Sequence, residues 1–184
     1  MRKSEKERDM EGVKEREGEM ITKHYLSMAA TTRQWKDVLY ICNERPDLQV
    51  NKLTKSGDTA LHLAVSDGQI KVVQQLIQLL RNSGERQTKE VLRAKNAMGN
   101  TPLHLAAALG SVHVCKSFAS IDDTLIRARN LEGETPLFVA VLNGNKDAFL
   151  YLHRLLNRTT DADYLRRMDG ETILHAAINQ EYFV

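Results

Sequence analysis

The sequence has few cysteine, proline and aromatic residues, and each shortage argues against a class of protein. Its 184 residues include two cysteines, three prolines, one tryptophan, five tyrosines and four phenylalanines. Cys42 and Cys115 form no CxxC motif and no Cys/His pair at zinc-finger spacing, so a disulfide framework is excluded and a reducing, cytoplasmic compartment is the simplest interpretation. The few aromatic residues disfavour a β-sandwich or barrel, and the few prolines argue against a loop-rich chain.

The chain also lacks long apolar runs and a surplus of charge of one sign. Its longest apolar runs are short, such as residues 137–142, whereas a membrane-spanning helix needs roughly 20 apolar residues. No secretory signal and no transmembrane segment are therefore expected. Lys and Arg number 26 against 24 Asp and Glu, which gives a net charge of +2. Because nucleic-acid-binding proteins usually carry a strongly basic surface, nucleic acid is not expected as a partner.

Residues 1–20 carry many charges of both signs and few apolar side chains. Such a segment has no apolar stripe to bury, although i,i+4 ion pairs can support transient helix. We therefore expect a charged, disordered tail over residues 1–20 and a folded region over residues 21–184. A coiled-coil arm and a docking peptide are the alternatives for the tail.

The rest of the chain repeats itself. Four segments share a Gly-x-Thr start followed by an apolar helical stretch, and their threonines are Thr59, Thr101, Thr135 and Thr172. The threonines are spaced 34 to 42 residues apart, which indicates insertions confined to loops. The longest insertion covers residues 81–96, where we expect an extra helical turn over 89–93.

A fifth, degenerate unit covers residues 26–48 and precedes the other four. It lacks the Gly-x-Thr start and carries Arg33 where three of the other units have glycine. Because the end units of repeat arrays are atypical, we interpret this unit as the N-terminal cap.

These segments resemble the ankyrin repeat, whose pattern includes G-x-T-P-L-H-x-A-A-x-x-G. The best match is GNTPLHLAA over residues 99–107. The resemblance implies an all-α fold, an ankyrin-repeat helix–turn–helix solenoid with about four recognisable repeats plus the degenerate N-terminal unit. It also implies that histidines of the TPLH motif tie together the backbone of adjacent turns; these are His62, His104 and His175, and Phe138 replaces the histidine in the third unit.

Elementary physical chemistry supports the same helix starts. The threonine of each repeat motif is well placed to cap the N-terminus of its helix, and each such cap contributes about 1 kcal/mol to stability. Pro102 and Pro136 occupy the first helical position, where a missing N–H costs nothing. The motif glycines provide the backbone freedom that the preceding tight turn requires.

No catalytic, cofactor or metal site is apparent in the sequence. It contains no G-x-S-x-G, Walker, G-x-G-x-x-G or H-E-x-x-H motif at the required context. Histidines one repeat apart would be too distant to share one metal ion. We therefore expect no cofactor, no metal and no enzymatic activity.

The resemblance implies a non-catalytic protein–protein interaction module, a scaffold or adaptor with another protein as its partner. Stretches outside the general motif, such as KNAMGNTPLHLAA, KDAFLYLH and RRMDGETILHAAI, resemble the plant ankyrin-repeat/PGG-domain family of the accelerated-cell-death type. In that family a cytosolic ankyrin array precedes a multi-span membrane domain, and the group is implicated in defence and stress signalling. The alternative function is therefore an N-terminal cytosolic regulatory fragment of such a membrane protein, at the cytosolic face of a membrane.

The fourth unit has a first helix from residue 173 to about residue 179, and the sequence ends before a second helix could follow. We therefore expect an incomplete last repeat in which Leu152, Leu155 and Leu174 are poorly covered. Exposed apolar surface promotes association, so self-association through this end is predicted.

We place the partner-binding face on the loop tips and the ends of the first helices, by analogy with other ankyrin arrays. None of these positions is needed by the capping and packing pattern of the repeat, so their chemistry is expected to suit a partner with an apolar anchor flanked by Lys or Arg. The alternative is a solvated, unused face. The predicted residues are Lys55, Ser56, Asp58, Ser66, Asp67, Met98, Asn100, Ala108, Leu109, Leu131, Glu132, Glu134, Leu142, Asn143, Asp169 and Glu171.

Overall fold

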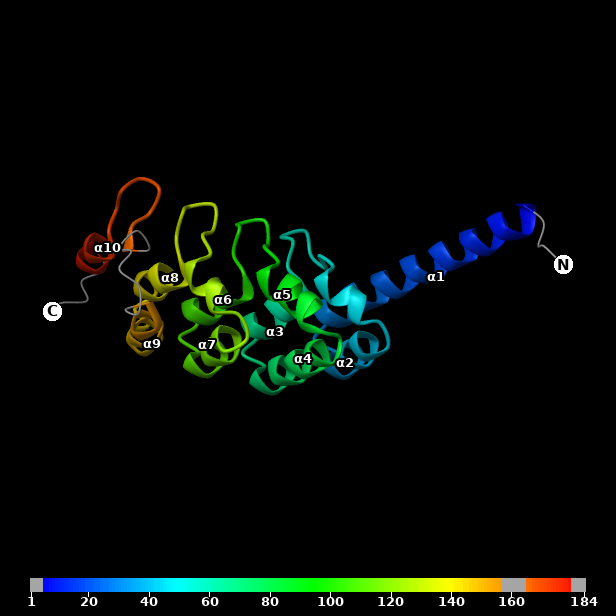
Figure 1. The fold of residues 1–184 in the computed structure, drawn as a ribbon, viewed down its shortest axis with the longest axis horizontal. Helices are drawn as coiled ribbons and strands as arrows, with labels where there is room; N and C mark the ends of the chain where they lie inside the picture. Colours follow the sequence, from blue (N-terminus) through cyan, green and yellow to red (C-terminus); the bar gives the residue numbers. More distant parts are fainter. Residues whose placement is uncertain (1–4, 157–164, 180–184) are drawn as a thin grey trace.

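The chain folds into a row of short helices whose connecting loops project from one side (Figure 1). The computed structural model describes residues 5–156 and 165–179, and the side chains of residues 17–156 and 165–178. All regular structure in these ranges is helical, so the predicted all-α solenoid is confirmed. The helices are α1 Glu5–Thr31, α2 Trp35–Glu44, α3 Ala60–Ser66, α4 Ile70–Asn82, α5 Glu85–Arg93, α6 Pro102–Ala108, α7 Val112–Ala119, α8 Pro136–Leu142, α9 Lys146–Leu156 and α10 Ile173–Asn179, with 3-10 helices η1 Pro46–Val50 and η2 Asp123–Arg127.

Each repeat consists of a projecting loop, a seven-residue inner helix and an outer helix that runs back beside it. Repeat 1 contains α3 and α4, repeat 2 contains α6 and α7, and repeat 3 contains α8 and α9. Repeat 4 is described as far as its inner helix, α10. The finger loops, as we name the projecting loops, cover residues 53–58, 96–100, 130–134 and 166–171 of repeats 1 to 4.

Helix α1 is longer than the sequence analysis expected. Residues 5–20 were expected to form a disordered tail, but the structure places them in α1, which extends away from the array (Figure 1). The segment contains no proline, and i,i+4 pairs such as Lys23–Glu19, with 2.5 Å between Nζ and Oε1, support a helix that has no apolar stripe. The predicted boundary at residue 20 therefore lies inside a continuous helix.

The last turns of α1 form the first layer of the core. Leu26, Ala29 and Ala30 are buried against α2, as the interpretation of residues 26–48 as a degenerate first unit requires. Arg33 follows with φ of 61°, close to the 66° of Gly68 at the same position of repeat 1. Its side chain pairs with Asp67, with 2.9 Å between Nε and Oδ2, so an arginine in the left-handed region links the cap to repeat 1.

One continuous apolar core runs along the array between the inner and outer helices. It extends from Leu26 in α1 to Leu156 in α9, and alanines such as Ala64 and Ala106 let adjacent inner helices approach closely. The largest fully buried side chains include Leu61, Leu76, Leu103, Phe118 and Leu137. Since each layer packs only on its neighbours, the stability of each repeat depends on the adjacent ones.

The predicted extra turn at residues 89–93 is a complete helix. Helix α5 covers nine residues, from Glu85 to Arg93, and buries Val91 and Leu92 in the main core. Arg93 also pairs with Asp122 of repeat 2, with 2.6 Å between Nε and Oδ2. The insertion is thus part of the packed structure.

Truncation of a core leucine should destabilise the array strongly. Leu103 is fully buried in α6, so Leu103→Ala should lower the free energy of unfolding by about 2–5 kcal/mol through lost burial and an unfilled cavity. Leu109→Ala, at an exposed position beside the same helix, should change it by less than about 0.5 kcal/mol. Denaturant titration followed by circular dichroism measures both. Equal midpoints for the two variants would contradict the core assignment.

Candidate functional site

The finger loops of repeats 2 and 3 are shaped by an asparagine at their base. The Asn96 side-chain oxygen accepts hydrogen bonds from the backbone N–H of Met98 and Asn100, at 3.0 and 3.1 Å. Asn130 does the same for Glu132 and Glu134, at 3.0 and 2.9 Å. These bonds satisfy backbone N–H groups inside each loop, and the side chains at the loop tip face solvent.

The tight turn also needs glycine at one position in each loop. Gly99 and Gly133 adopt φ of 76° and 77°, where side chains are disfavoured. A Cβ atom at Gly99 would in addition lie 2.7 Å from the backbone nitrogen of Leu131 in the next loop. The glycine is therefore required by both the turn and the close approach of adjacent fingers.

Adjacent finger loops are joined edge to edge. The backbone N–H of Ala97 donates to the Ser56 carbonyl at 2.7 Å, and that of Leu131 donates to the Met98 carbonyl at 3.0 Å. The same asparagines add side-chain bonds, from Asn96 Nδ2 to Asp58 at 2.9 Å and from Asn130 Nδ2 to Asn100 at 2.9 Å. The tips of successive loops are thereby held in one row.

Buried histidines provide a second link between repeats, as predicted for this motif. His62 Nε2 lies 3.0 Å from the Asn100 carbonyl, and His104 Nε2 lies 3.1 Å from the Glu134 carbonyl. The Nδ1 atom of His104 faces the backbone N–H of Thr101 at 3.1 Å, so Nδ1 accepts and Nε2 carries the proton. The neutral ring thus joins the start of its own helix to the loop of the next repeat.

A groove opens between the finger loops of repeats 2 and 3 and the ends of helices α6 and α8. Its volume is about 350 Å³. Met98 and Leu131 stand at its edge with 64% and 69% of their surface exposed, while Val139 and Leu142 lie deeper. Glu132 supplies a carboxylate at the rim that is 66% exposed. The groove therefore combines apolar walls with an acidic edge.

Half of the residues predicted for partner binding come together in this groove. Those lining it are Met98, Asn100, Ala108, Leu131, Glu132, Glu134, Leu142 and Asn143. The others lie elsewhere on the array and are Lys55, Ser56, Asp58, Ser66, Asp67, Leu109, Asp169 and Glu171. Three lining residues were not predicted, namely Ala97, Asn130 and Val139. The motif position of Asn130 is shared with Asn96, and this recurrence is the signal that could have identified both.

The premise that all predicted polar positions are free to suit a partner is wrong for several of them. Asp58 accepts bonds from Asn96 at 2.9 Å and from Ser56 at 2.5 Å, and Asp67 pairs with Arg33. Glu134 is 9% exposed and accepts from Asn130 Nδ2 at 2.8 Å. Asn100, Asp169 and Glu171 also make hydrogen bonds or ion pairs inside the array. Some of these partners lie in the same loop, whereas those of Asp58 at Asn96, of Asp67 at Arg33 and of Asn100 at Asn130 lie on other units, which the repeat pattern of a single unit does not show.

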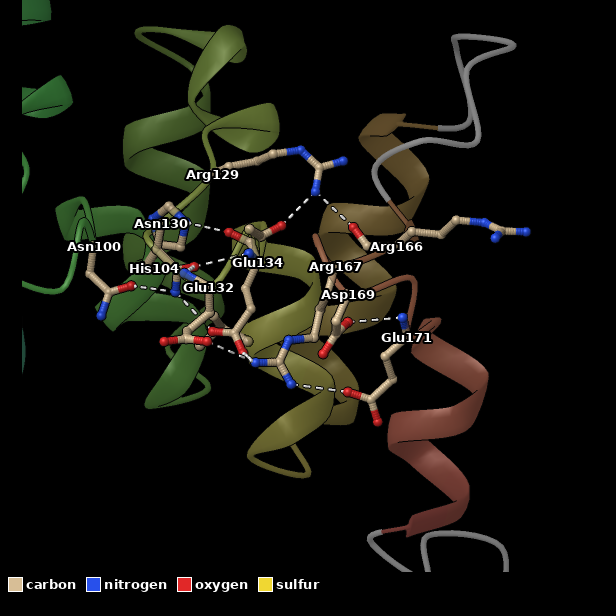
Figure 2. Close-up of polar contacts among 12 residues, drawn as sticks. Asn100, His104, Arg129, Asn130, Glu132, Glu134, Arg166, Arg167, Asp169 and Glu171 are labelled. Atoms are coloured by element: carbon tan, nitrogen blue, oxygen red, sulfur yellow. Dashed lines mark hydrogen bonds and ion pairs between the residues drawn. The ribbon is translucent and has the colours of Figure 1, made fainter.

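Repeat 4 is attached differently from the others (Figure 2). Phe138 occupies the histidine position of repeat 3 and is fully buried in a small cluster with Val141 and Ala176. Arg167 stands where the loops of repeats 2 and 3 have asparagine, and its guanidinium carbon lies 5.9 Å from the centre of the Phe138 ring. The Arg167 side chain pairs with Glu132 and Glu134 of repeat 3. Arginine and glutamate thus replace the histidine link at this junction.

Comparison with protein families identifies the repeat type. The model of the family described as ankyrin repeats (3 copies) matches residues 26–127 and 77–162, which together include most of the chain. The chain belongs to the ankyrin-repeat family. No curated protein matches it. Ankyrin repeats generally form non-catalytic protein–protein interaction modules, and the fold and loop geometry above are those of such an array.

The described part of this ankyrin array offers little reactive chemistry. Both cysteines are buried, and burial raises the pKa of the Cys42 and Cys115 thiols to about 12, so neither forms a thiolate near neutral pH. Over residues 5–156 and 165–179, no group of three or more His, Cys, Asp or Glu side chains is placed to hold a metal ion. No helix in the same ranges is long and apolar enough to cross a membrane.

The buried histidine links should make the array sensitive to acid. Burial lowers the pKa of His104 to about 4, and lowers that of His62 as well. Below the ordinary histidine pKa of about 6.5 the unfolded chain binds protons that the folded chain does not, so stability is full above pH 6.5 and falls towards pH 4. Between pH 7 and pH 5 the His104 contribution should be a loss of about 2 kcal/mol.

The test compares His104→Gln with His24→Gln, which changes an exposed histidine on α1. Unfolding free energies are measured at pH 7 and pH 5. His104→Gln should lower stability at pH 7 but shrink the difference between the two pH values, whereas His24→Gln should leave that difference unchanged. A difference unaffected by His104→Gln would show that this ring is not the titrating group.

Proposed function

We propose that the protein is a non-catalytic ankyrin scaffold or adaptor that binds another protein in the groove between the finger loops of repeats 2 and 3. The observation that carries the proposal is the convergence of exposed apolar side chains and an acidic rim at one concave place. Met98 and Leu131 are held at the tips of two hydrogen-bonded loops, so their positions are set before any partner arrives. Because the site is already ordered, the free-energy cost of ordering it during binding is small.

The chemistry of the groove fits a segment with one apolar anchor next to a Lys or Arg. Clusters of large apolar side chains are uncommon on protein surfaces, and they often mark interaction sites. The anchor would pack between Met98, Leu131 and Leu142, and the basic group would lie against Glu132. Because Glu134 is buried and hydrogen-bonded, we assign the rim charge to Glu132. Association with such a segment should slow as salt concentration rises.

Selection from a random peptide display library tests the site without knowledge of the natural partner. The 184-residue protein is the bait, and enriched peptides should pair an apolar residue with a neighbouring Lys or Arg. Met98→Ser with Leu131→Ser should weaken binding of the enriched peptides at least tenfold, since two apolar contacts are lost. Fluorescence anisotropy with labelled peptides gives the affinities.

Tyr40→Ser is the matched control, because Tyr40 is a similarly exposed large side chain, with 68% of its surface exposed, on α2, and Figure 1 shows α2 well away from α6 and α8. This variant should bind like the parent, and circular dichroism should show that all variants are folded. Peptides that bind the Met98/Leu131 variant as tightly as the parent would place the site elsewhere or leave this face unused.

Self-association through the C-terminal end is a second proposal. Leu174 and Ile178 lie one turn apart on α10, with 60% and 56% of their surface exposed, which supports it. The expectation that Leu152 is poorly covered is wrong, because Leu152 is fully buried in the main core. The predicted lack of a second helix concerns residues 180–184, which lie outside the described residues. Light scattering should show that the parent protein forms dimers and that the double variant Leu174→Ser with Ile178→Ser is monomeric. A parent protein that is monomeric at all concentrations would contradict the proposal.

The finer proposal is that this array is the cytosolic regulatory part of a plant PGG-type membrane protein that acts in defence or stress signalling. It is supported by the sequence resemblance of stretches such as RRMDGETILHAAI. A longer transcript that encodes several apolar runs of about 20 residues downstream would support this proposal. A transcript with no such runs would exclude it.

A further inference from the structure

Three kinds of bond recur at the junctions between repeats 1 and 2 and between repeats 2 and 3. A histidine Nε2 donates to the next repeat, as His62 does to Asn100 and His104 to Glu134. A backbone N–H in each finger loop donates to the preceding loop. An asparagine side chain, Asn130 in the second case, adds a further bond between loops. None of these bonds is an ion pair, because at least one of the two groups in each bond is uncharged.

The junction between repeats 3 and 4 lacks the first two of these bonds. Phe138 has no ring nitrogen, so no imidazole can reach the carbonyl of Glu171, which is the equivalent of Asn100 and Glu134 in the repeat pattern. Over the described residues, Met168 makes no backbone bond to the finger loop of repeat 3, although Ala97 and Leu131 make the equivalent bonds at the other junctions. The third position, that of the asparagine, is occupied by Arg167.

Charge takes the place of the missing bonds. The Arg167 guanidinium lies 3.3 Å from Glu132 Oε2 and 3.4 Å from Glu134 Oε1 across the junction, and 3.0 Å from Glu171 Oε2 within its own loop. Its side chain is 20% exposed, so solvent and ions reach the cluster. Beside it, Arg129 Nη1 donates to the Arg166 carbonyl at 2.7 Å (Figure 2), as Lys95 Nζ does to the Arg129 carbonyl at 2.8 Å at the preceding junction. The apolar contact at this junction is a separate small cluster, in which Phe138, Val141 and Ala176 are buried and Leu142, Phe149, Ile173 and Ala177 pack against them partly buried.

We propose that Arg167 is a charge latch that holds repeat 4 onto repeat 3, so that ions competing for Glu132 and Glu134 release repeat 4 while repeats 1 to 3 stay folded. Salt screens exposed and half-exposed charges strongly, because the Debye length shortens from about 10 Å at 0.1 M to about 3 Å at 1 M. The buried histidine bonds of the other junctions are not accessible to ions in this way. Among repeats 2 to 4, repeat 4 is therefore the one whose docking onto the preceding repeat should depend most strongly on ionic strength.

Both latch carboxylates also line the groove. A basic group of a bound segment would compete with Arg167 for Glu132, so occupation of the groove would loosen repeat 4; this coupling rests on the proposed function, whereas the latch itself does not. The latch would then act as an internal competitor for the acidic rim. Binding at the groove and release of repeat 4 would be coupled, because both involve the same pair of carboxylates.

Hydrogen exchange read by mass spectrometry tests the latch on the full chain. Amides of residues 173–179 should lose protection by about three- to tenfold between 0.05 and 1 M NaCl, while amides of residues 102–108 keep theirs. Arg167→Gln should give the low protection of residues 173–179 already at 0.05 M NaCl, with little further salt response. Phe138→His should restore the histidine bond and reduce the salt response.

Arg166→Gln is the matched control. It removes the same charge one residue away, but Arg166 is exposed and its side chain belongs to none of the ion pairs among the described residues. This variant should behave like the parent. Protection of residues 173–179 that is equal at both salt concentrations in the parent, or equal effects of Arg167→Gln and Arg166→Gln, would overturn the latch. Addition of a groove-selected peptide tests the coupling separately: lost protection supports it, and unchanged protection refutes the coupling while leaving the salt result to decide the latch.

Discussion

A neutral imidazole buried between successive repeats is the interaction on which the rest of the array depends. In repeat 2 the ring of His104 accepts from the backbone N–H at the start of its own helix and donates to the carbonyl of Glu134 in the next repeat. The ring satisfies the buried N–H of Thr101 and gives the Glu134 carbonyl a second donor, beside the backbone N–H of Asn130. The bond fixes the distance between an inner helix and the following finger loop, and the same arrangement in repeat 1 extends it along the array.

The candidate binding groove is a consequence of this fixed spacing. Because the loops cannot separate, the tips at Met98 and Leu131 stay side by side and the ends of α6 and α8 form the wall behind them. Loop asparagines complete the arrangement by satisfying the backbone within each loop. Rigid loops with apolar tips would offer the proposed partner a surface that needs little reorganisation.

The last junction shows what happens when the histidine is replaced. Phe138 contributes apolar burial but no hydrogen bond, and Arg167 supplies the connection through charge. A buried neutral bond is insensitive to ionic strength but sensitive to acid, whereas a half-exposed ion pair depends on salt. The junctions between repeats 1 and 3 and the junction of repeat 4 should therefore respond differently to solution conditions, although they share one repeat pattern.

The sequence by itself determined the repeats, the helix starts and the role of His62 and His104. Thr59 and Thr135 cap their helices as predicted, because capping depends on residues within one turn of each other. Only the tertiary structure decided the continuous helix α1, the partners of Asp58 and Glu134, and the function of Arg167 in place of asparagine. The interactions of Asp58 with Asn96 and of Arg167 with Glu134 join residues about one repeat apart, and their geometry is set by how neighbouring repeats pack, which the local pattern of a single repeat does not contain.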